Sequence, residues 1–341
     1  MTKTILLMRP HLDVNFKADA GHDINRKPDE SKAKWPRNFY LSLYENLEEW
    51  LINEEYAVAR AHFPMCHLTP KLARSIPAYA TIMMHRQDFE FDHHPNTIYL
   101  KDTPFPDWFS FDTKGWGGTA SFYPFDITNG DPKSGMFEMC QEKYIKNNWS
   151  KFKQPAQVGR TDLPDDFIFW PCQLPHDQTL KYHARLNVHR VLTDLVVWCH
   201  RNKKHLVVKR HPVPKPGNES MRRYQEIVEA IASPYIHWIE NISVHECLHQ
   251  CSSVYLFNSG TGFEALLHEK PVVTFGDAEY DCISVTGEIL YPRFNKIYDN
   301  LDFDTDKTKA FFDLWFKVCI KADDQKTFGK LIKTLDNMPS L

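Results

Sequence analysis

The sequence predicts an α/β protein with a mostly parallel β-sheet and helices on both faces. The first observation is that apolar runs alternate with amphipathic stretches between Phe167 and Phe275, as expected for strands that alternate with helices. The second is that the runs are rich in β-branched and aromatic residues, which favour strands. Repeated β–α–β units give parallel strands joined by right-handed crossovers. The length of 341 residues favours two domains, with one large α/β domain as the alternative.

The stretch Ser253–Gly276 contains one complete β–α–β unit, in which two apolar runs flank a short helix. The turn before the helix is made of small residues and leads directly to a helix N-terminus, a geometry that binds phosphate. Its glycine spacing is neither the dinucleotide fingerprint nor a Walker loop. The alternative is that a turn hydroxyl caps a buried helix and the glycines serve the turn. The turn consists of Asn258, Ser259, Gly260, Thr261 and Gly262.

The other elements follow from the same periodicities. Two C-terminal helices, at 309–322 and 325–335, are expected to pack back across both halves of the chain. The polar, proline-containing segment 151–166 is the candidate linker. Strands are predicted at 4–8, 97–100, 167–170, 206–209, 237–239, 254–257 and 271–275, and helices at 38–52, 68–84, 135–149, 183–200, 221–231 and 244–250.

Three strand ends of the second half carry polar side chains. Loops that follow parallel strands gather at one edge of the sheet, so Gln173–Asp177, Lys209–Pro212 and Asn258–Gly262 should converge. Lys209 and His211 would then bring cationic donors to a phosphate, although a single strand-end histidine is often structural. Asp177 is a candidate general base or partner of a sugar hydroxyl.

Glu264 lies in the first turn of the helix that follows the phosphate-binding turn. Its carboxylate could accept hydrogen bonds from ribose or sugar hydroxyls. The alternative is that it compensates the positive end of the helix dipole. Both interpretations stay open at this point.

A loop in the first half, Pro104–Phe125, combines glycines with aromatic residues. Trp116 stands between Gly115 and Gly117, which suits stacking on a sugar or a base. Asp112, just before these glycines, is a second candidate catalytic carboxylate. The alternative is a tight turn packed under its own tryptophans.

No metal site is expected. The helix that contains His245, Cys247, His249 and Cys251 directs its two i,i+4 pairs to different sides, so the four side chains cannot close one tetrahedral site. The His/Asp-rich stretch 85–94 is interpreted as a solvated loop, because its spacing matches no ligand pattern.

Composition excludes several classes of protein. The net charge of −3, with no basic block, argues against nucleic-acid binding. The 8 cysteines form no CxxC pair, and the N-terminal residues lack the apolar region of a signal peptide, so we expect a cytoplasmic protein with reduced thiols. No apolar run is long enough to span a bilayer, so at most peripheral membrane contact is expected.

The ordered motifs resemble those of the capsule-polysaccharide biosynthesis glycosyltransferases, above all the Kdo transferases of capsule export. The resemblance covers residues 167–285. By this likeness, His211 and Pro212 match a His-Pro motif that contacts the donor phosphate, and Ser259, Gly260 and Thr261 match the phosphate-binding turn. It is carried by Lys209–Pro212, Ser243–His245, Asn258–Leu266 and Lys270–Gly276, and Gln173–Asp177 looks like the Gln-containing strand end near the donor.

The resemblance implies two Rossmann-like domains in a GT-B-like arrangement: an acceptor domain at 1–155, a nucleotide-sugar domain at 156–300, and helices at 301–341. It implies a metal-independent transferase that moves Kdo or a similar sugar from a nucleotide-sugar to a surface or capsule glycan, with the donor as co-substrate and no other cofactor. The donor residues would be those of the three strand ends with Glu264, and the acceptor residues Gly115, Trp116 and Gly117. The alternatives are a sugar-nucleotide epimerase of similar build and a non-catalytic binding protein.

Overall fold

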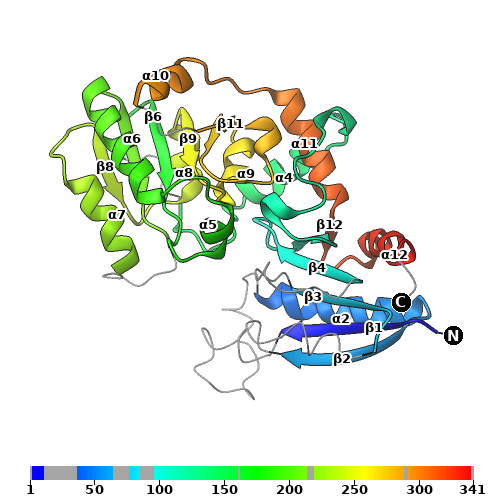
Figure 1. Ribbon diagram of the computed structural model, residues 1–341. Coiled ribbons are helices and arrows are strands. Elements are labelled where there is room, and N and C mark those ends of the chain that lie inside the picture. The colour runs from blue at the N-terminus through cyan, green and yellow to red at the C-terminus, as the bar shows by residue number, and fades with distance from the viewer. Residues whose placement is uncertain are drawn as a thin grey trace. The chain divides into compact units, whose positions relative to one another are not determined.

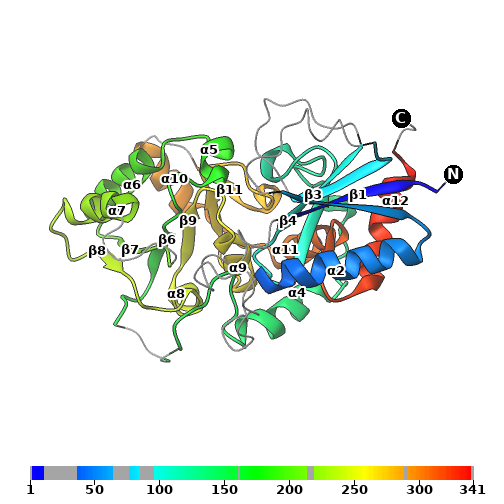
Figure 2. The same cartoon turned by 90° about the horizontal axis from the view of Figure 1, so that it is seen from below.

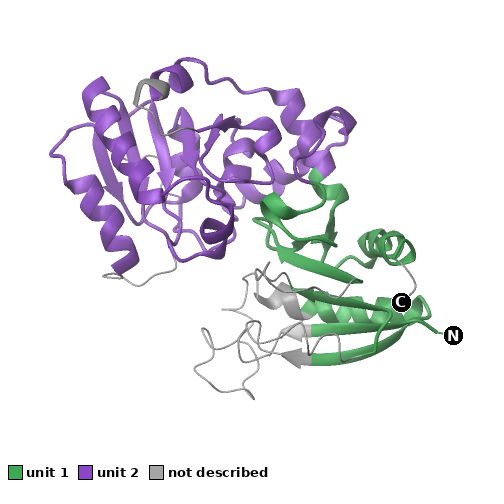
Figure 3. Cartoon of the chain, in the orientation of Figure 1, with its two compact units in different colours: residues 1–122, 315–341 green, residues 123–314 purple. Residues whose placement is uncertain are grey.

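The computed structural model describes residues 2–10, 37–63, 77–84, 96–157, 159, 162–212, 219–287 and 291–338. The chain forms two compact units. Figure 1 shows the elements of the whole chain, and Figure 3 gives each unit its own colour. Unit 1 comprises residues 1–122 and 315–341, and unit 2 comprises residues 123–314. Each unit contains a six-stranded sheet with helices packed on it, which confirms the predicted class of two Rossmann-like α/β domains.

The sheet of unit 1 has the order β12-β5-β4-β3-β1-β2. Strands β1 to β4 are parallel, whereas β5 and β12 add an antiparallel edge. Helices α2 and α12 bury apolar side chains against one face of this sheet. The elements are β1 (Thr4–Pro10), α2 (Arg37–Asn53), β2 (Ala57–Phe63), β3 (Ala80–Met84), β4 (Thr97–Asp102), β5 (Trp108–Asp112), β12 (Cys319–Lys321), η5 (Gln325–Phe328) and α12 (Gly329–Asp336).

The sheet of unit 2 has the order β11-β10-β9-β6-β7-β8, and all of its strand pairs are parallel. The elements are α4 (Met136–Cys140), η3 (Gln141–Ile145), β6 (Phe167–Pro171), α5 (Gln178–His183), α6 (Val188–Asn202), β7 (His205–Lys209), α7 (Glu219–Glu229), β8 (Ile236–Ile239), α8 (Val244–Gln250), β9 (Ser253–Leu256), α9 (Thr261–Leu267), β10 (Val272–Thr274), β11 (Val285–Thr286), α10 (Tyr291–Asp299) and α11 (Thr305–Lys317).

Helices cover both faces of the sheet in unit 2, as Figure 2 shows with α6 and α7 on one side and α8 and α9 on the other. Strand side chains alternate between the two faces. Ile168 and Trp170 of β6 therefore join the core under α6 and α7, while Phe167 and Phe169 point to the opposite side. Burial on both faces explains why β6 is apolar throughout.

The strand order of unit 2 reverses next to β6. The chain runs from β6 to β7 and β8 on one side, and then returns to form β9, β10 and β11 on the other side. The switch point lies between the adjacent strands β6 and β9. Loops that leave two such strands diverge, and the crevice between them is where open α/β sheets bind ligands.

The structure corrects several boundaries. The end of the predicted helix 68–84 is strand β3, and the end of the predicted helix 309–322 is strand β12. The helix predicted at 183–200 corresponds to α6, which begins later, at Val188, and α5 was not predicted apart from its last residue, His183. Strands β2 and β5 were not predicted. Residues 68–76 of the predicted helix 68–84 and the stretch 85–94 lie outside the described residues.

The division into units also differs from the predicted boundaries at 155 and 300. Residues 123–155 belong to unit 2, where Gln141 Nε2 donates to Leu267 O at 2.8 Å and Ser243 Oγ donates to Asn148 Oδ1 at 2.6 Å. The last residues belong to unit 1 because β12 pairs with β5. The C-terminal helices are thus divided between the units, α10 and most of α11 in one and α12 in the other.

Candidate functional site

The candidate site lies at the carboxyl edge of the sheet in unit 2, where β6 and β9 diverge. Gln173 follows β6 and Asn258 follows β9, and their side chains form a reciprocal pair: Gln173 Nε2 donates to Asn258 Oδ1 at 3.0 Å, and the Asn258 backbone N–H donates to Gln173 Oε1 at 3.3 Å. Both residues are buried. The two strand ends converge as predicted, and a polar pair joins them at the switch point.

Asn258 has a further structural contact. Its Nδ2 donates to the backbone oxygen of Thr179 at 2.9 Å, which ties the start of α5 to the end of β9. A Cβ atom on Gly276 would lie 3.1 Å from this Nδ2 and 2.7 Å from His183 O, so only glycine allows the backbone so close. Gln173 and Asn258 therefore hold the edge together.

Hydrogen bonds between its own residues hold the turn before α9 in place. Ser259 Oγ accepts a hydrogen bond from the Thr261 N–H at 3.2 Å, and Ser259 O accepts from the Gly262 N–H at 2.9 Å. Helix α9 has only seven residues. These contacts support the capping interpretation of Ser259. Gly260 has right-handed helical backbone angles, so the turn does not use it for a left-handed conformation.

Gly262 is a glycine for a packing reason. A Cβ atom at this position would overlap the ring of Tyr280, whose hydroxyl donates to Ser259 O at 2.6 Å. Tyr280 is fully buried, so the ring cannot move aside into solvent. The glycine admits a buried tyrosine that itself fixes the turn.

A buried ammonium and a buried carboxyl group lie behind the turn. Lys209 ends β7 and Glu264 lies in α9, and each is only 5% exposed. Burial raises the pKa of Glu264 to about 7, although hydrogen bonds from Ser150 and Thr261 and the charge of Lys209 oppose the rise. Among the described residues, Glu264 Oε1 has no hydrogen-bond partner. Burial lowers the pKa of Lys209, because a weakly solvated place disfavours the charged ammonium, and the nearby carboxyl group of Glu264 opposes this shift.

His211 follows Lys209 at the same edge. Its ring packs edge-on against Phe152, with the ring centroids 5.2 Å apart. Burial lowers the pKa of His211 to about 4; Asp177 opposes this shift, and the cations Lys209, Lys151 and Arg210 reinforce it. His211 is therefore a neutral imidazole at pH 7, and its neighbours are mostly cationic. Pro212, the next residue, is exposed.

Asp177 has a structural role at this edge. It is the N-cap of α5, and its Oδ1 accepts from the Thr179 N–H at 2.9 Å and from the Thr179 hydroxyl at 3.0 Å. It is half-buried and close enough to His211 to act on it electrostatically. The structure thus brings Asp177 to the predicted edge and uses one of its oxygens as a helix cap.

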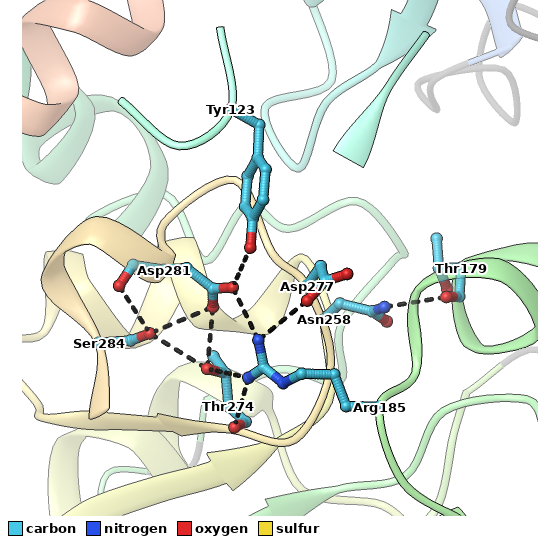
Figure 4. Close-up of polar contacts among 8 residues, drawn as sticks. All are labelled: Tyr123, Thr179, Arg185, Asn258, Thr274, Asp277, Asp281 and Ser284. Carbon is cyan, nitrogen blue, oxygen red and sulfur yellow. Dashed lines mark hydrogen bonds and ion pairs between the residues drawn. The ribbon is translucent and has the colours of Figure 1, made fainter. Parts of the chain in front are cut away.

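A polar network borders the ends of β10 and α5 (Figure 4). Arg185 Nη1 contacts Asp277 at 2.9 Å and Asp281 at 3.2 Å, and Nη2 donates to the backbone oxygen of Thr274 at 3.0 Å. Asp281 also accepts from the hydroxyl of Tyr123 at 2.7 Å. The sequence analysis did not identify these residues, because they are far apart in the chain and form no local motif.

In unit 1 the predicted acceptor loop is a tight turn. Asp112 accepts from the Lys114 and Gly115 N–H groups at 2.7 and 2.8 Å, and from Ser121 N–H at 3.0 Å, so its carboxylate organises the loop. Trp116 is only 2% exposed and lies under the ammonium of Lys101. The interpretation of Trp116 as an exposed stacking residue is therefore wrong, because the indole is part of the packed turn.

Gly115 and Gly117 are required by the backbone geometry of that loop. Gly117 has φ +56°, a left-handed conformation that favours glycine. A Cβ atom on Gly115 would lie 2.6 Å from Thr119 Oγ1. Both glycines are thus explained by the fold of the turn.

His245 makes contacts that a metal ligand would have to give up. Its Nε2 lies 2.9 Å from Trp149 O and its Nδ1 lies 3.0 Å from His268 Nε2. Among the described residues, no three His, Cys, Asp or Glu side chains are grouped so that they could hold a metal ion. In the same part of the chain, no helix combines the length and apolar character needed to cross a bilayer.

Unit 2 is thus a doubly wound α/β domain whose polar strand-end residues lie at the carboxyl edge beside its topological switch point. Its residues 140–302 match the family described as capsule polysaccharide biosynthesis protein. The matched segment contains all six strands of the sheet and the residues from Gln173 to Glu264. This match confirms the resemblance that the strand-end motifs predict.

Individual relatives are more distant. The capsule polysaccharide export protein KpsS of Escherichia coli is 26% identical over 134 residues, which are 37% of this chain and 33% of KpsS. The chain therefore spans about a third of the length of that curated relative. Two Thermosulfurimonas dismutans KpsC structures are similar: the β-Kdo 2,4 transferase (TM-score 0.49, 14% identity, 81% of this chain and 88% of that one) and the β-Kdo 2,7 transferase (TM-score 0.47, 17% identity, 84% and 95%).

Proposed function

We propose that this protein is a glycosyltransferase of capsule polysaccharide biosynthesis, which transfers a sugar from a nucleotide-sugar to a glycan acceptor. The observation that carries the proposal is that Lys209 and His211 lie at the same sheet edge as the turn before α9, next to the switch point. Ligands of doubly wound sheets bind at this edge. The family match over residues 140–302 supports the role in capsule biosynthesis.

The chemical step that this edge supports is departure of the nucleotide. Negative charge develops on the phosphate as the sugar–phosphate bond breaks, and fixed donors in a weakly solvated site stabilise that charge. Lys209 is suited to this role because its amino group is a buried donor, and a bound phosphate would favour its charged form. His211 would bind the phosphate from the neighbouring position, where a bound anion favours the protonated imidazole.

We infer that acid–base assistance comes from unit 2. Asp177 has one carboxylate oxygen bound to the start of α5 and lies near His211, so it is our candidate for contact with a sugar or acceptor hydroxyl. Asp112 is not a candidate, because its oxygens are used by the loop in which it lies. Glu264, with a buried and unpartnered Oε1 among the described residues, would accept a hydrogen bond from a donor hydroxyl.

The donor sugar is proposed as Kdo or a similar acid, and the reaction as metal-independent. A thermal-shift panel of CMP-, UDP-, GDP- and TDP-linked compounds tests the nucleotide, because a ligand that binds only the folded state raises the melting temperature. The nucleotide with the largest shift identifies the donor class. The shift should persist in EDTA, and Lys209→Gln should reduce it. No shift with any of the four would contradict the proposal.

Product analysis separates the alternatives. A transferase releases nucleotide in proportion to the sugar added to an acceptor glycan. An epimerase would convert the nucleotide-sugar without an acceptor. A binding protein would show the thermal shift with no turnover, whether or not Asp177 is replaced by Ala.

A further inference from the structure

The segment Asn148–Gln154 runs from the end of the predicted helix 135–149 into the candidate linker 151–166, and it is fixed along the candidate-site edge of unit 2. We call it the strap. It has three anchors at the start of α8: Asn148 Oδ1 accepts from Ser243 Oγ at 2.6 Å, Trp149 O accepts from His245 Nε2 at 2.9 Å, and Gln154 Oε1 accepts from the Val244 N–H at 2.9 Å. Helix α8 follows β8, so its start lies at the carboxyl edge of the sheet.

Between these anchors the strap contacts the candidate site twice. The hydroxyl of Ser150 hydrogen bonds to the carboxyl group of Glu264. The ring of Phe152 packs edge-on against His211, at 5.2 Å between centroids and an interplanar angle of 71°. One contact reaches α9, which follows β9, and the other reaches the segment after β7, so the strap contacts elements from both sides of β6.

Lys151 lies between these two contact residues. It is close enough to His211 to act on the imidazole electrostatically, together with Lys209 and Arg210. Asp177 and Glu264 offset part of this positive charge. Lys151, Lys209 and Arg210 each disfavour the protonated imidazole of His211, and a phosphate bound beside that ring would be attracted by their charges.

We propose that the strap forms one wall of the ligand site, and that Lys151 binds the same phosphate group of the ligand as Lys209 and His211. This inference rests on the proposed nucleotide-sugar function and adds a specific binding residue to it. Ser150 and Phe152 are positioning residues in this scheme, because they act through Glu264 and His211.

The test compares two charge-removing variants of the strap, Lys151→Met and Lys153→Met. Lys153 lies two residues further along and is exposed, so it is a matched control. Isothermal titration measures binding of inorganic pyrophosphate and of CMP, UDP, GDP and TDP at several salt concentrations. The uncharged nucleosides of the same bases are the reference ligands.

We expect Lys151→Met to weaken phosphate-dependent binding about tenfold or more, as for one lost charge-assisted hydrogen bond. Nucleoside binding and the melting temperature should not change, and the salt dependence of nucleotide binding should decrease. Lys153→Met should bind as the wild type does.

Two results would overturn the assignment of Lys151 alone: wild-type affinity in Lys151→Met, or equal losses in both variants, which would indicate only a diffuse charge effect. Failure of the wild-type protein to bind any phosphate ligand would overturn the proposed function, and the role of the strap with it. The wild-type titration thus distinguishes the two failures.

Discussion

Gln173 and Asn258 exchange two hydrogen bonds, at 3.0 and 3.3 Å, across the point where the strand order of unit 2 reverses. Side chains that follow diverging strands are normally separated by the crevice between them. Here a buried amide pair joins the two strand ends directly. The distance between the ends of β6 and β9 is therefore set by side chains as well as by the sheet.

Replacing Gln173 by Met should destabilise unit 2 by about 1–3 kcal/mol, because it leaves the buried Oδ1 and backbone N–H of Asn258 without their partner. Urea denaturation followed by tryptophan fluorescence measures the loss. Gln225→Met is the control, because the Gln225 side chain is partly exposed and bonds only to Glu229 of its own helix, and it should change stability by less than about 0.5 kcal/mol. Equal midpoints for Gln173→Met and the wild type would contradict a structural role for the pair.

The stability of the protein should depend on the ionisation of Glu264. Its pKa is raised from 4.5 to about 7, so between these values the folded protein binds more protons than the unfolded chain. Stability should therefore fall as the pH rises through this window and level off above it. The whole effect is roughly 3 kcal/mol at most.

Glu264→Gln removes this titration and should flatten the pH dependence of the free energy of unfolding between pH 4.5 and 7. Glu269→Gln is the control, because Glu269 is exposed and its removal should leave the slope unchanged. If both variants retain the wild-type slope, Glu264 is not the titrating group.

The ring of Phe152 should control the protonation of His211. Burial lowers the pKa of His211 to about 4, and Phe152→Ala opens one side of the imidazole to water, so the pKa should rise toward 6.5. Titration of the histidine ring protons by NMR measures the change. Phe152→Leu keeps an apolar cover and should move the pKa less. An unchanged pKa in Phe152→Ala would show that the ring does not shield His211.

Gly262, in the first turn of helix α9, should not tolerate any side chain. Gly262→Ala brings a methyl group into the buried ring of Tyr280, and such overpacking costs about 1–3 kcal/mol. Gly329→Ala is the matched control, because no atom lies within 4 Å of a Cβ built at Gly329 and the site is helical. It should be neutral or stabilising, by up to about 1 kcal/mol. Equal melting temperatures for the two variants would contradict the packing explanation.

Strands with continuous apolar runs were predicted well, because a central parallel strand is buried on both faces and is therefore apolar along its length. Strands β6, β7 and β9 were found within a residue or two of their observed ends. Strands β3 and β12 were predicted as parts of helices. Each is short, and periodicity alone does not separate a short strand from a helix segment. β12 is a strand because β5 offers it an antiparallel edge, a partner about 200 positions earlier in the chain.

The candidate site likewise has a part that could be predicted from sequence and a part that could not. The strand-end residues Gln173, Lys209, His211 and Asn258 could be identified from sequence, because parallel order alone sends these ends to one edge. Their partners could not. The indole of Trp116 is buried where a stacking surface was expected, and Ser259 and Asp177 use their oxygens as caps. Whether a polar atom faces a ligand or its own backbone depends on the geometry of the turn.

The sequence by itself determined the alternation of strands and helices, the edge at which the polar residues gather and the family that they resemble. The tertiary structure decided the limits of the two units, the burial of Lys209 with Glu264, the Arg185 network and the position of the strap beside His211. The physical reason is the separation along the sequence between the residues that interact. Strand and helix patterns are set by neighbouring residues, whereas burial and hydrogen-bond partners depend on segments that meet only when the chain is folded.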